Sequence, residues 1–507
     1  MLYAVHPKSI EQTLTMRPRR PIVEFACCFA FFGLTGGVPT RAQDPDPPIR
    51  VRFDAMHSHT WIETLPQPGL NQYHLLAGPS RAAQALSAMG WQVDVQLEAW
   101  DAESLASLDL VVLNLVSVDR PAFRVSEIAA LREFVQQGAG LIIITDHTNC
   151  YFHNHALEPL FDQLDLNLSN ATACEHAPYT LGQGGGWILI ESFGEHPIVS
   201  GIKHVGIQTG GTVDARFAVA WTSPTSWADR GRIPIYGEGK DMGFTGDFHQ
   251  QPDEPNGPLP VLAAKEFGAG RIVVLGDQNA IGGLFLNYAD NRRLWLQCAR
   301  WAAGPNKEPT QQEPTDRMAR GLAADTGRSL VWCVEPLADR NIYWGSADRQ
   351  DYYHAFALLN KYADARATDR CPSEAQWMIV PSEPLMKQEH WRNQVREFLE
   401  QPGKHAVVWR EEGSSNPSDW IPEVLPNEST ASVDSEWIGT WTKTNGSTLE
   451  LWKNTKRWTN RELLGPEASR NDADVRLEEA MIGPLWERGL KRVKSLDQTI
   501  DWPGDEP

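Results

Sequence analysis

The chain has 507 residues, which is long enough for two or three domains. Hydrophobic residues make up 41% of it and charged residues 22%, a composition typical of globular proteins. Its formal net charge is -19. A surface this acidic repels phosphate groups and anionic headgroups, so we predict no nucleic-acid partner and no docking on an anionic membrane.

The N-terminal stretch has the pattern of an export signal. A basic region containing Arg19 and Arg20 precedes the apolar run 22–34, which is too short to span a bilayer as a helix. Small and polar residues follow. We therefore predict a signal peptide over residues 1–42, with Met16 favoured as the start of translation. The mature protein is expected to be exported, periplasmic or extracellular, and soluble, without a membrane span.

Strands and helices alternate through the first half of the chain. Short apolar or alternating runs predict strands at 50–55, 91–97, 108–116, 141–145 and 271–275. Amphipathic spacing predicts helices at 71–89, 125–137 and 291–303. Strands that alternate with helices imply right-handed crossovers and a parallel sheet.

Five segments in this half follow one another in a distinctive order: LREFVQQGAGLIIITDH, NHALEPLFDQLDLNL, EHPIVSGI, AVAWTSPTSWADR and GPLPVLAAKEFGAGRIVVLGDQNAI. The order resembles degenerate class I glutamine amidotransferase-like domains. Such domains occur in auxiliary components of gliding-motility ABC transporters, in an intraflagellar-transport subunit and in uncharacterised exported bacterial proteins. The resemblance covers residues 50–304 and implies a flavodoxin-like α/β domain, which we delimit as 43–304.

The nucleophile of an active glutaminase is missing from this pattern. Active members of the family resemble Gly-x-Cys-x-Gly at a strand-to-helix elbow, where a later histidine helps to form the thiolate. Here the strand runs into the sequence TDHTNC at 145–150, without flanking glycines. We therefore predict that glutaminase chemistry is absent and that Cys150 is a loop cysteine.

Polar residues nevertheless gather where three of the predicted strands end. The residues of this predicted crevice are Asp54, His57, His59, Asp146, His147, Asn149, His153, His155, Asp277 and Asn279. We expect the histidines to lie in loops. The carboxyl edge of a parallel sheet is where such folds bind ligands. The first hypothesis is thus a binding or interaction module, whose partner is a small polar ligand or a protein.

The alternative hypothesis is a metal-dependent hydrolase. Carboxylate and imidazole bind zinc and similar divalent metals, which can activate water. The first-choice ligands are Asp54, His57, His59, Asp146 and His147. The segments FDAMHSHT and IITDHT are similar to two pieces of the PHP-type phosphoesterase pattern, although an additional strand separates them here. Against a metal, loop histidines are common, and an aspartate at a strand end often only caps the next helix.

The second half repeats the order of the first. After a Pro-containing linker at 305–325, strands are predicted at 329–334, 377–380 and 405–409, and helices at 351–362 and 387–401. We predict a second, smaller α/β domain at 326–460 with a structural or interaction role. Its hairpin turns at Asn445-Gly446. A charged helical tail follows at 461–507.

Export would permit disulfides among the five cysteines of the mature chain. Cys150 with Cys174, and Cys333 with Cys371, are the two pairings that we propose from their neighbouring loop-like segments, since sequence does not fix connectivity. Cys298 lies on a predicted helix, where we expect a buried thiol.

Overall fold

The computed structural model describes most of the chain between residues 48 and 453. The described ranges are 48–59, 78–182, 185–230, 246–282, 285–304, 329–346, 348–349, 352–353, 355–356, 359–360, 363–410, 420–425, 430–432 and 437–453. The predicted signal peptide, linker and charged tail lie outside them. Within them, no helix combines the length and apolar character that crossing a membrane requires.

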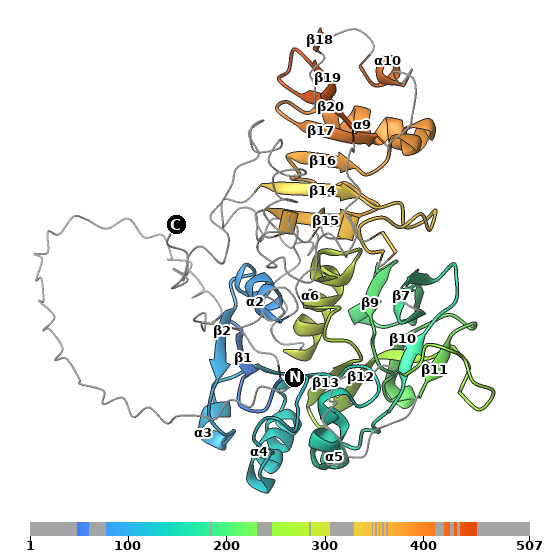
Figure 1. The fold of residues 1–507 in the computed structure, drawn as a ribbon. Coiled ribbons are helices and arrows are strands. Elements are labelled where there is room, and N and C mark those ends of the chain that lie inside the picture. The colour runs from blue at the N-terminus through green and yellow to red at the C-terminus, as the bar shows by residue number, and fades with distance from the viewer. Residues whose placement is uncertain are drawn as a thin grey trace, which may run out of the picture. The chain divides into compact units, whose positions relative to one another are not determined.

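The first sheet has eight strands (Figure 1). In spatial order they are β2 (Gln92–Gln96), β1 (Arg50–Asp54), β3 (Leu110–Asn114), β4 (Gly140–Ile144), β13 (Gly270–Leu275), β12 (Pro260–Phe267), β10 (Ala218–Trp221) and β8 (Ser192–Phe193). The first five are parallel. Their order along the chain is 2-1-3-4-5, the flavodoxin-like order. The last three strands are antiparallel to their neighbours.

Helices cover both faces of this sheet. They are α2 (Ser80–Ser87), α3 (Ala102–Leu105), α4 (Val125–Gln136), α5 (His153–Leu164) and α6 (Asn291–Ala302). Successive side chains of a strand point to opposite faces. Ile142 and Ile144 of β4 accordingly join the apolar core under α2 and α6. Leu141 and Ile143 join the core under α4 and α5. Both faces are buried, which explains why β3 and β4 are continuous apolar runs.

Between α5 and β12 the chain forms two small antiparallel sheets. One contains β6 (Thr180–Gly182), β7 (Trp187–Ile190) and β9 (Val205–Gln208), and the other contains β5 (Thr172–Cys174) and β11 (Trp227–Asp229). Short 3-10 helices occur at Cys150–Phe152, Pro197–Val199, Ala215–Phe217, Phe285–Asn287 and Glu383–Lys387. These strands are hard to recognise from the sequence, because three of the five have only three residues and therefore carry too little periodicity.

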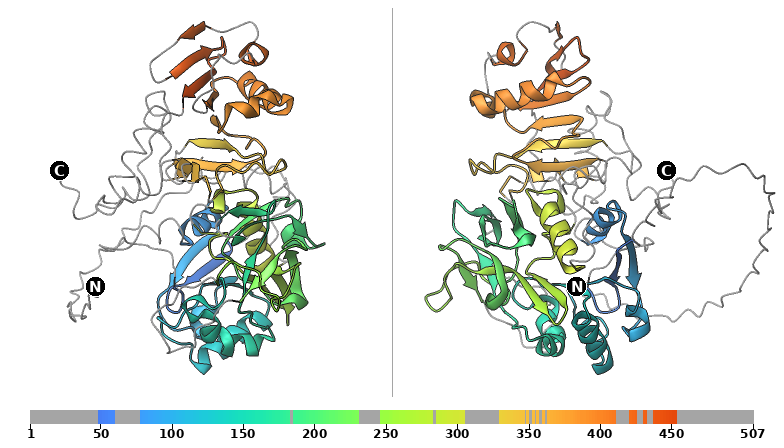
Figure 2. Two further views of the ribbon diagram at one scale, coloured as in Figure 1. Left: turned by 45° about the vertical axis from the view of Figure 1, so that its right-hand side comes forward. Right: turned by 180° about the vertical axis from the view of Figure 1, so that it is seen from behind.

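The second sheet repeats the strand order of the first. In spatial order its strands are β15 (Asp364–Thr368), β14 (Leu330–Val334), β16 (Trp377–Val380), β17 (His405–Arg410), β20 (Thr448–Lys453), β19 (Trp437–Thr442) and β18 (Thr430–Ser432). Five parallel strands again run 2-1-3-4-5, and an antiparallel hairpin partner follows. The prediction of a second, smaller α/β sheet of similar order is confirmed. Its strands are coloured yellow to red in Figure 2.

The secondary structure of this half also agrees with the sequence. The predicted helix at 387–401 is present as α9 (Glu389–Glu400), and the described residues from 352 to 360 are helical. A short helix that was not predicted, α10 (Ile421–Val424), is also present. The hairpin turns at Asn445-Gly446, where Gly446 adopts a φ of 83°. β15 was missed because its sequence, DARAT, reads as polar, although Asp364 and Arg366 are buried as an ion pair.

The two predicted disulfides are wrong. Cys150, Cys174, Cys333 and Cys371 are all free thiols. Cys174 lies on β5, where it pairs with Trp227 of β11, whereas Cys150 lies in the turn after β4. Cys333 is buried on β14, a strand with neighbours on both sides. Proximity along the chain, on which both pairings were based, did not predict a bond. Cys298 is buried on α6, as predicted.

Candidate functional site

The loop after β1 is organised by Asp54. Its Oδ2 accepts hydrogen bonds from the backbone N–H of His57 (2.8 Å) and from the backbone N–H and hydroxyl of Ser58 (2.7 and 2.8 Å). Its Oδ1 accepts one from Trp100 Nε1 (3.0 Å) and lies 2.9 Å from His57 Nδ1. Both carboxylate oxygens are thus committed inside the protein, and Asp54 has a structural role here.

His57 belongs to the same closed network. Its side chain is fully buried and stacks on Phe123, with 4.0 Å between ring centroids. Its Nε2 lies 3.3 Å from Glu127 Oε1, which also accepts a hydrogen bond from the backbone N–H of Trp100. Glu127 is on α4, so the network ties the end of β1 to a helix on one face of the sheet. Sequence analysis missed Trp100 and Glu127, because nothing in their local pattern marks them as partners.

His59 lies at the rim of the sheet edge and does not join Asp54 and His57. Its Nδ1 is 3.2 Å from Asp119 Oδ2, and its ring stacks on Tyr151 at 3.7 Å. Of the predicted metal set, Asp54 and His57 therefore form one group, His59 lies in another contact, and Asp146 and His147 lie in a third. The five residues do not meet as one ligand set.

The third group is built where β4 and β13 end. Asp146 directly follows β4 by way of Thr145, and Asp277 follows β13. Burial raises the pKa of Asp146 well above its ordinary value, and the charge of Asp277 raises it further. Burial also raises the pKa of Asp277 to about 7, against the lowering effect of the backbone N–H bonds that it accepts from Gln208 and Asn279.

A glycine pair packs directly against these two aspartates. A Cβ added at Gly210 would lie 2.9 Å from the Cβ of Asp277, and one at Gly211 would overlap the carbonyl oxygen of Asp146. Gly211 also donates its N–H to Gly276 O at 2.6 Å. Only glycine permits this close approach, so the sequence TGGT at 209–212 is the signal that could have placed this loop over the site.

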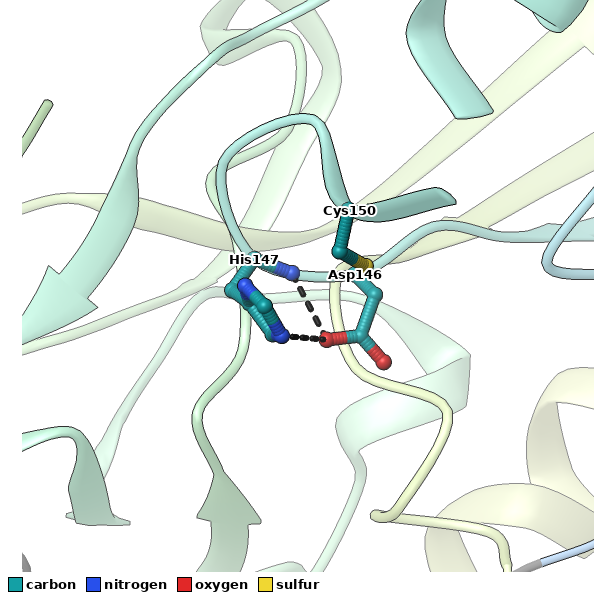
Figure 3. Close-up of side chains that lie close together, drawn as sticks. All are labelled: Asp146, His147 and Cys150. Atoms are coloured by element: carbon teal, nitrogen blue, oxygen red, sulfur yellow. Dashed lines mark hydrogen bonds and ion pairs between the residues drawn. The ribbon is translucent and has the colours of Figure 1, made fainter. Parts of the chain in front are cut away.

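Cys150 lies in the turn after β4, at the same carboxyl edge of the sheet. Asp146, His147 and Cys150 each offer a ligand atom, and these three atoms lie within 4.8 Å of one another (Figure 3). Burial first, then the charges of Asp146 and Asp277, raise the pKa of the thiol well above its ordinary value. The thiol is 1% exposed. Without a bound cation, this environment keeps the thiol protonated and inaccessible, the opposite of what a glutaminase nucleophile requires.

The turn that carries Cys150 is strained. Thr148, Tyr151 and Phe152 have φ values of 43°, 51° and 53°. A positive φ is uncommon for any residue with a side chain and unfavourable for a β-branched one, and such strain clusters at functional sites. The backbone here thus forms a tight strand-to-helix turn without glycines.

Two of the predicted loop histidines are helical. His153 begins α5 and is fully buried, with its Nδ1 2.9 Å from Cys150 O, and burial lowers its pKa to about 4. His155 is exposed on the same helix. The expectation that both lie in loops is wrong, because the helix starts sooner after β4 than the polar sequence indicates. Asn149 Oδ1 accepts the Asn154 N–H, and Asn279 Nδ2 donates to Gln208 O.

The described surface also has a groove of about 840 Å³ between α3 and α4. Its lining includes Leu105 and Phe134, together with Asp109 and Ala139, which precede β3 and β4. The groove therefore opens at the amino ends of the strands and is separate from the carboxyl-edge site.

Fold and site together define a protein of two α/β sheets with flavodoxin-like order, in which the first sheet carries a largely buried Asp-His-Cys group at its carboxyl edge. No protein-family model matches the chain. No curated protein matches it either.

Solved structures do resemble parts of the chain. The mmIFT52 N-terminal domain aligns with 51% of this chain and 100% of its own length, at 13% identity and a TM-score of 0.36. ThuA-like proteins from Parabacteroides merdae and Bacteroides uniformis each align with 53% of this chain. They cover 94% and 95% of their own lengths at 14% identity, with TM-scores of 0.31 and 0.32. Neither activity nor partner follows from likenesses this distant.

Proposed function

We propose that the first α/β unit is a binding module that has lost glutaminase chemistry and whose carboxyl edge holds a cation. One observation carries the proposal: Asp146 and Asp277 are buried side by side at the ends of adjacent strands. Among the described residues, neither is ion-paired with a lysine or arginine. Buried carboxylates are unfavourable unless a positive charge compensates them.

The stability of the ligand-free protein tests this proposal. If the pair serves binding, its mutual repulsion destabilises the empty protein, as is common at functional sites. Asp146→Asn removes that repulsion while keeping one oxygen for the His147 N–H. We expect it to raise the Tm of chelator-treated protein at pH 8. Asp119→Asn is the control, because Asp119 also lies beside a histidine but is exposed. A lower Tm for Asp146→Asn would assign Asp146 a structural role instead.

The loss of glutaminase chemistry has its own test. Iodoacetamide should alkylate Cys371, which is partly exposed, much faster than Cys150 in the native protein. Mass spectrometry of peptides from the two sites measures the ratio. Comparable rates, or ammonia release from glutamine that disappears in Cys150→Ser, would contradict the proposal.

A metal-dependent hydrolase is the second candidate, favoured by the meeting of Asp146, His147 and Cys150. A metal held there with an open position could activate water. The PHP-type set that included Asp54 and His57 has no support, because those residues are sealed in their own network. Zinc-dependent hydrolysis of p-nitrophenyl phosphate or acetate that His147→Ala abolishes would support this candidate. Equal rates with and without zinc would remove it.

Export also remains part of the proposal, supported by the basic and apolar N-terminal pattern. N-terminal sequencing of the secreted chain should begin at Gln43. A chain that keeps its first residues and stays with the cytoplasmic fraction would contradict it.

A further inference from the structure

We propose that Asp146, His147 and Cys150 bind one zinc ion, and that Asp277 stabilises it without coordinating it. This rests on the proposed cation-binding function and names the ion and its ligands. It replaces the five-residue set predicted from sequence with three residues from a single turn.

The geometry of the turn carries the proposal. Asp146, His147 and Cys150 follow β4 within six residues, and their ligand atoms lie within 4.8 Å of one another. Bonds of about 2.0–2.3 Å in a tetrahedral site place neighbouring ligand atoms roughly 3.3–3.8 Å apart. Small side-chain rotations therefore suffice to close the three atoms on an ion. Figure 3 shows the three side chains converging from one loop.

The types of ligand select the metal. A thiolate with an imidazole favours zinc over magnesium or calcium, which prefer oxygen alone. Three protein ligands leave the fourth position of a tetrahedral ion for water or another molecule. His147 offers a route inward, because its side chain is 16% exposed while Asp146 and Cys150 are almost fully buried.

Charge and positioning agree with this assignment. A zinc ion would face the negative charges of Asp146 and of the Cys150 thiolate, with Asp277 near both. Both oxygens of Asp277 accept backbone N–H bonds, from Gln208 at 2.7 Å and Asn279 at 2.8 Å, which fixes its carboxylate in place. Such neighbouring groups hold and tune a metal site without ligating the ion.

The experiment uses the full mature chain without a histidine tag. After treatment with a chelator, the protein is titrated with Zn²⁺ by calorimetry and, separately, with Co²⁺ while its near-ultraviolet spectrum is recorded. We expect one zinc per chain and a thiolate-to-cobalt charge-transfer band. Cys150→Ser should abolish the band and weaken zinc binding by at least about 100-fold, more than the loss of a neighbouring group does.

Matched variants make the assignment specific. Cys298→Ser, which alters another buried thiol, should keep both the band and the affinity. Asp277→Asn should weaken zinc binding by about 10- to 100-fold while the band persists. His147→Ala should weaken it as Cys150→Ser does, and because His147 is partly exposed this variant should fold. His57→Ala should leave zinc affinity unchanged.

Two results would overturn the zinc assignment: no zinc bound by the wild-type chain, or zinc that persists in the Cys150→Ser, His147→Ala double variant. Either could occur while Asp146→Asn still raises the Tm of the ligand-free protein, in which case the cation-binding function stands and either the ion or its ligands differ from those proposed. A lowered Tm for Asp146→Asn together with no zinc would overturn both.

Discussion

Asp54 and Asp146 both lie at the carboxyl ends of parallel strands, yet their oxygens contact different partners. Asp54 accepts five polar contacts from its own loop and from Trp100. Asp146 accepts one short bond, from the His147 N–H at 2.7 Å, and a longer one from Gln278 at 3.4 Å. A carboxylate whose oxygens all accept hydrogen bonds inside the protein stabilises the fold. A carboxylate that accepts fewer hydrogen bonds and lies beside a second carboxylate is available to a ligand.

Replacing Asp54 should therefore affect stability and leave zinc binding intact. Asp54→Ala leaves the N–H groups of His57 and Ser58 and the indole of Trp100 without an acceptor inside the protein. We expect a loss of about 3 kcal/mol or more in the free energy of unfolding, since each unsatisfied buried donor costs about 1–3 kcal/mol. Urea denaturation measures it.

His59→Ala provides the comparison for Asp54→Ala. His59 is partly exposed and is not part of the Asp54 network, so its loss should change stability by only about 1 kcal/mol. If Asp54→Ala were as stable as wild type but lost zinc, Asp54 would be a ligand after all and the separation of the two networks would be wrong.

At the scale of elements, the first strand of each sheet ends in the same way. Asp54 at the end of β1 and Glu335 directly after β14 are buried carboxylates that accept backbone N–H bonds from the loop that follows. Each also accepts a bond from an aromatic side chain, Trp100 or Tyr288. The similarity of the two sheets thus includes the buried carboxylate that holds the loop after the first strand. The Asp-His-Cys group occurs after β4 only, among the described residues.

Gly210 and Gly211 pack against the residues that follow β4 and β13, so a substitution here tests how these elements build the site. Gly211→Ala places a Cβ against the Asp146 carbonyl, so the backbone must shift where the site is built. We expect a loss of about 3 kcal/mol in stability and weaker zinc binding. Calorimetry and urea denaturation test both effects.

Gly403→Ala is the control for this substitution. A Cβ at Gly403 meets open space, but the residue has a φ of 69°. It should lose only about 1 kcal/mol, from the left-handed backbone alone, with zinc affinity unchanged. Equal effects of the two substitutions would show that Gly211 matters for its backbone conformation and not for its contact with Asp146.

The sequence predicts elements with a strong period and misses contacts that depend on three dimensions. β3, β4 and α4 were recognisable because buried strands are continuously apolar and α4 is amphipathic. The separation of Asp54 from Asp146 was not recognisable from the sequence. It depends on Trp100 and Glu127, which contact Asp54 and His57 only in the folded chain. Strand-end position indicated Asp146 and His147 correctly as neighbours. It placed Cys150 in the loop without showing that its thiol turns toward them.

At the scale of the whole described chain, the two sheets meet through polar groups that are buried. Tyr288, which precedes α6, donates its hydroxyl to Glu335 at 3.3 Å, and Ala289 donates its N–H to Ala367 of β15 at 2.8 Å. Arg292 of α6 lies 3.6 Å from Asp364 of the second sheet. Because buried polar groups tolerate little displacement, these contacts couple the stability of the two sheets.

Glu335 makes this coupling depend on pH. Burial raises its pKa from 4.5 to about 7, despite N–H bonds from Tyr343 and Trp344 that favour the charged form. The folded chain then binds a proton that the unfolded chain has released, between pH 4.5 and 7. The free energy of unfolding contributed by this group therefore falls as pH rises through that window, by about 3 kcal/mol in total.

Glu335→Gln should remove this dependence, because glutamine does not titrate. Its stability can be lower throughout, since it has one oxygen fewer for the backbone N–H groups. The prediction concerns the slope. The stability of wild type relative to Glu335→Gln should fall by about 3 kcal/mol from pH 4.5 to pH 8. Urea denaturation across this range measures it.

Glu397→Gln, an exposed change on α9, should follow the wild-type slope. Parallel curves for wild type and Glu335→Gln would show that Glu335 is charged at pH 5 in the folded chain, and that its burial is compensated by the hydrogen bonds from Tyr288 and the following loop.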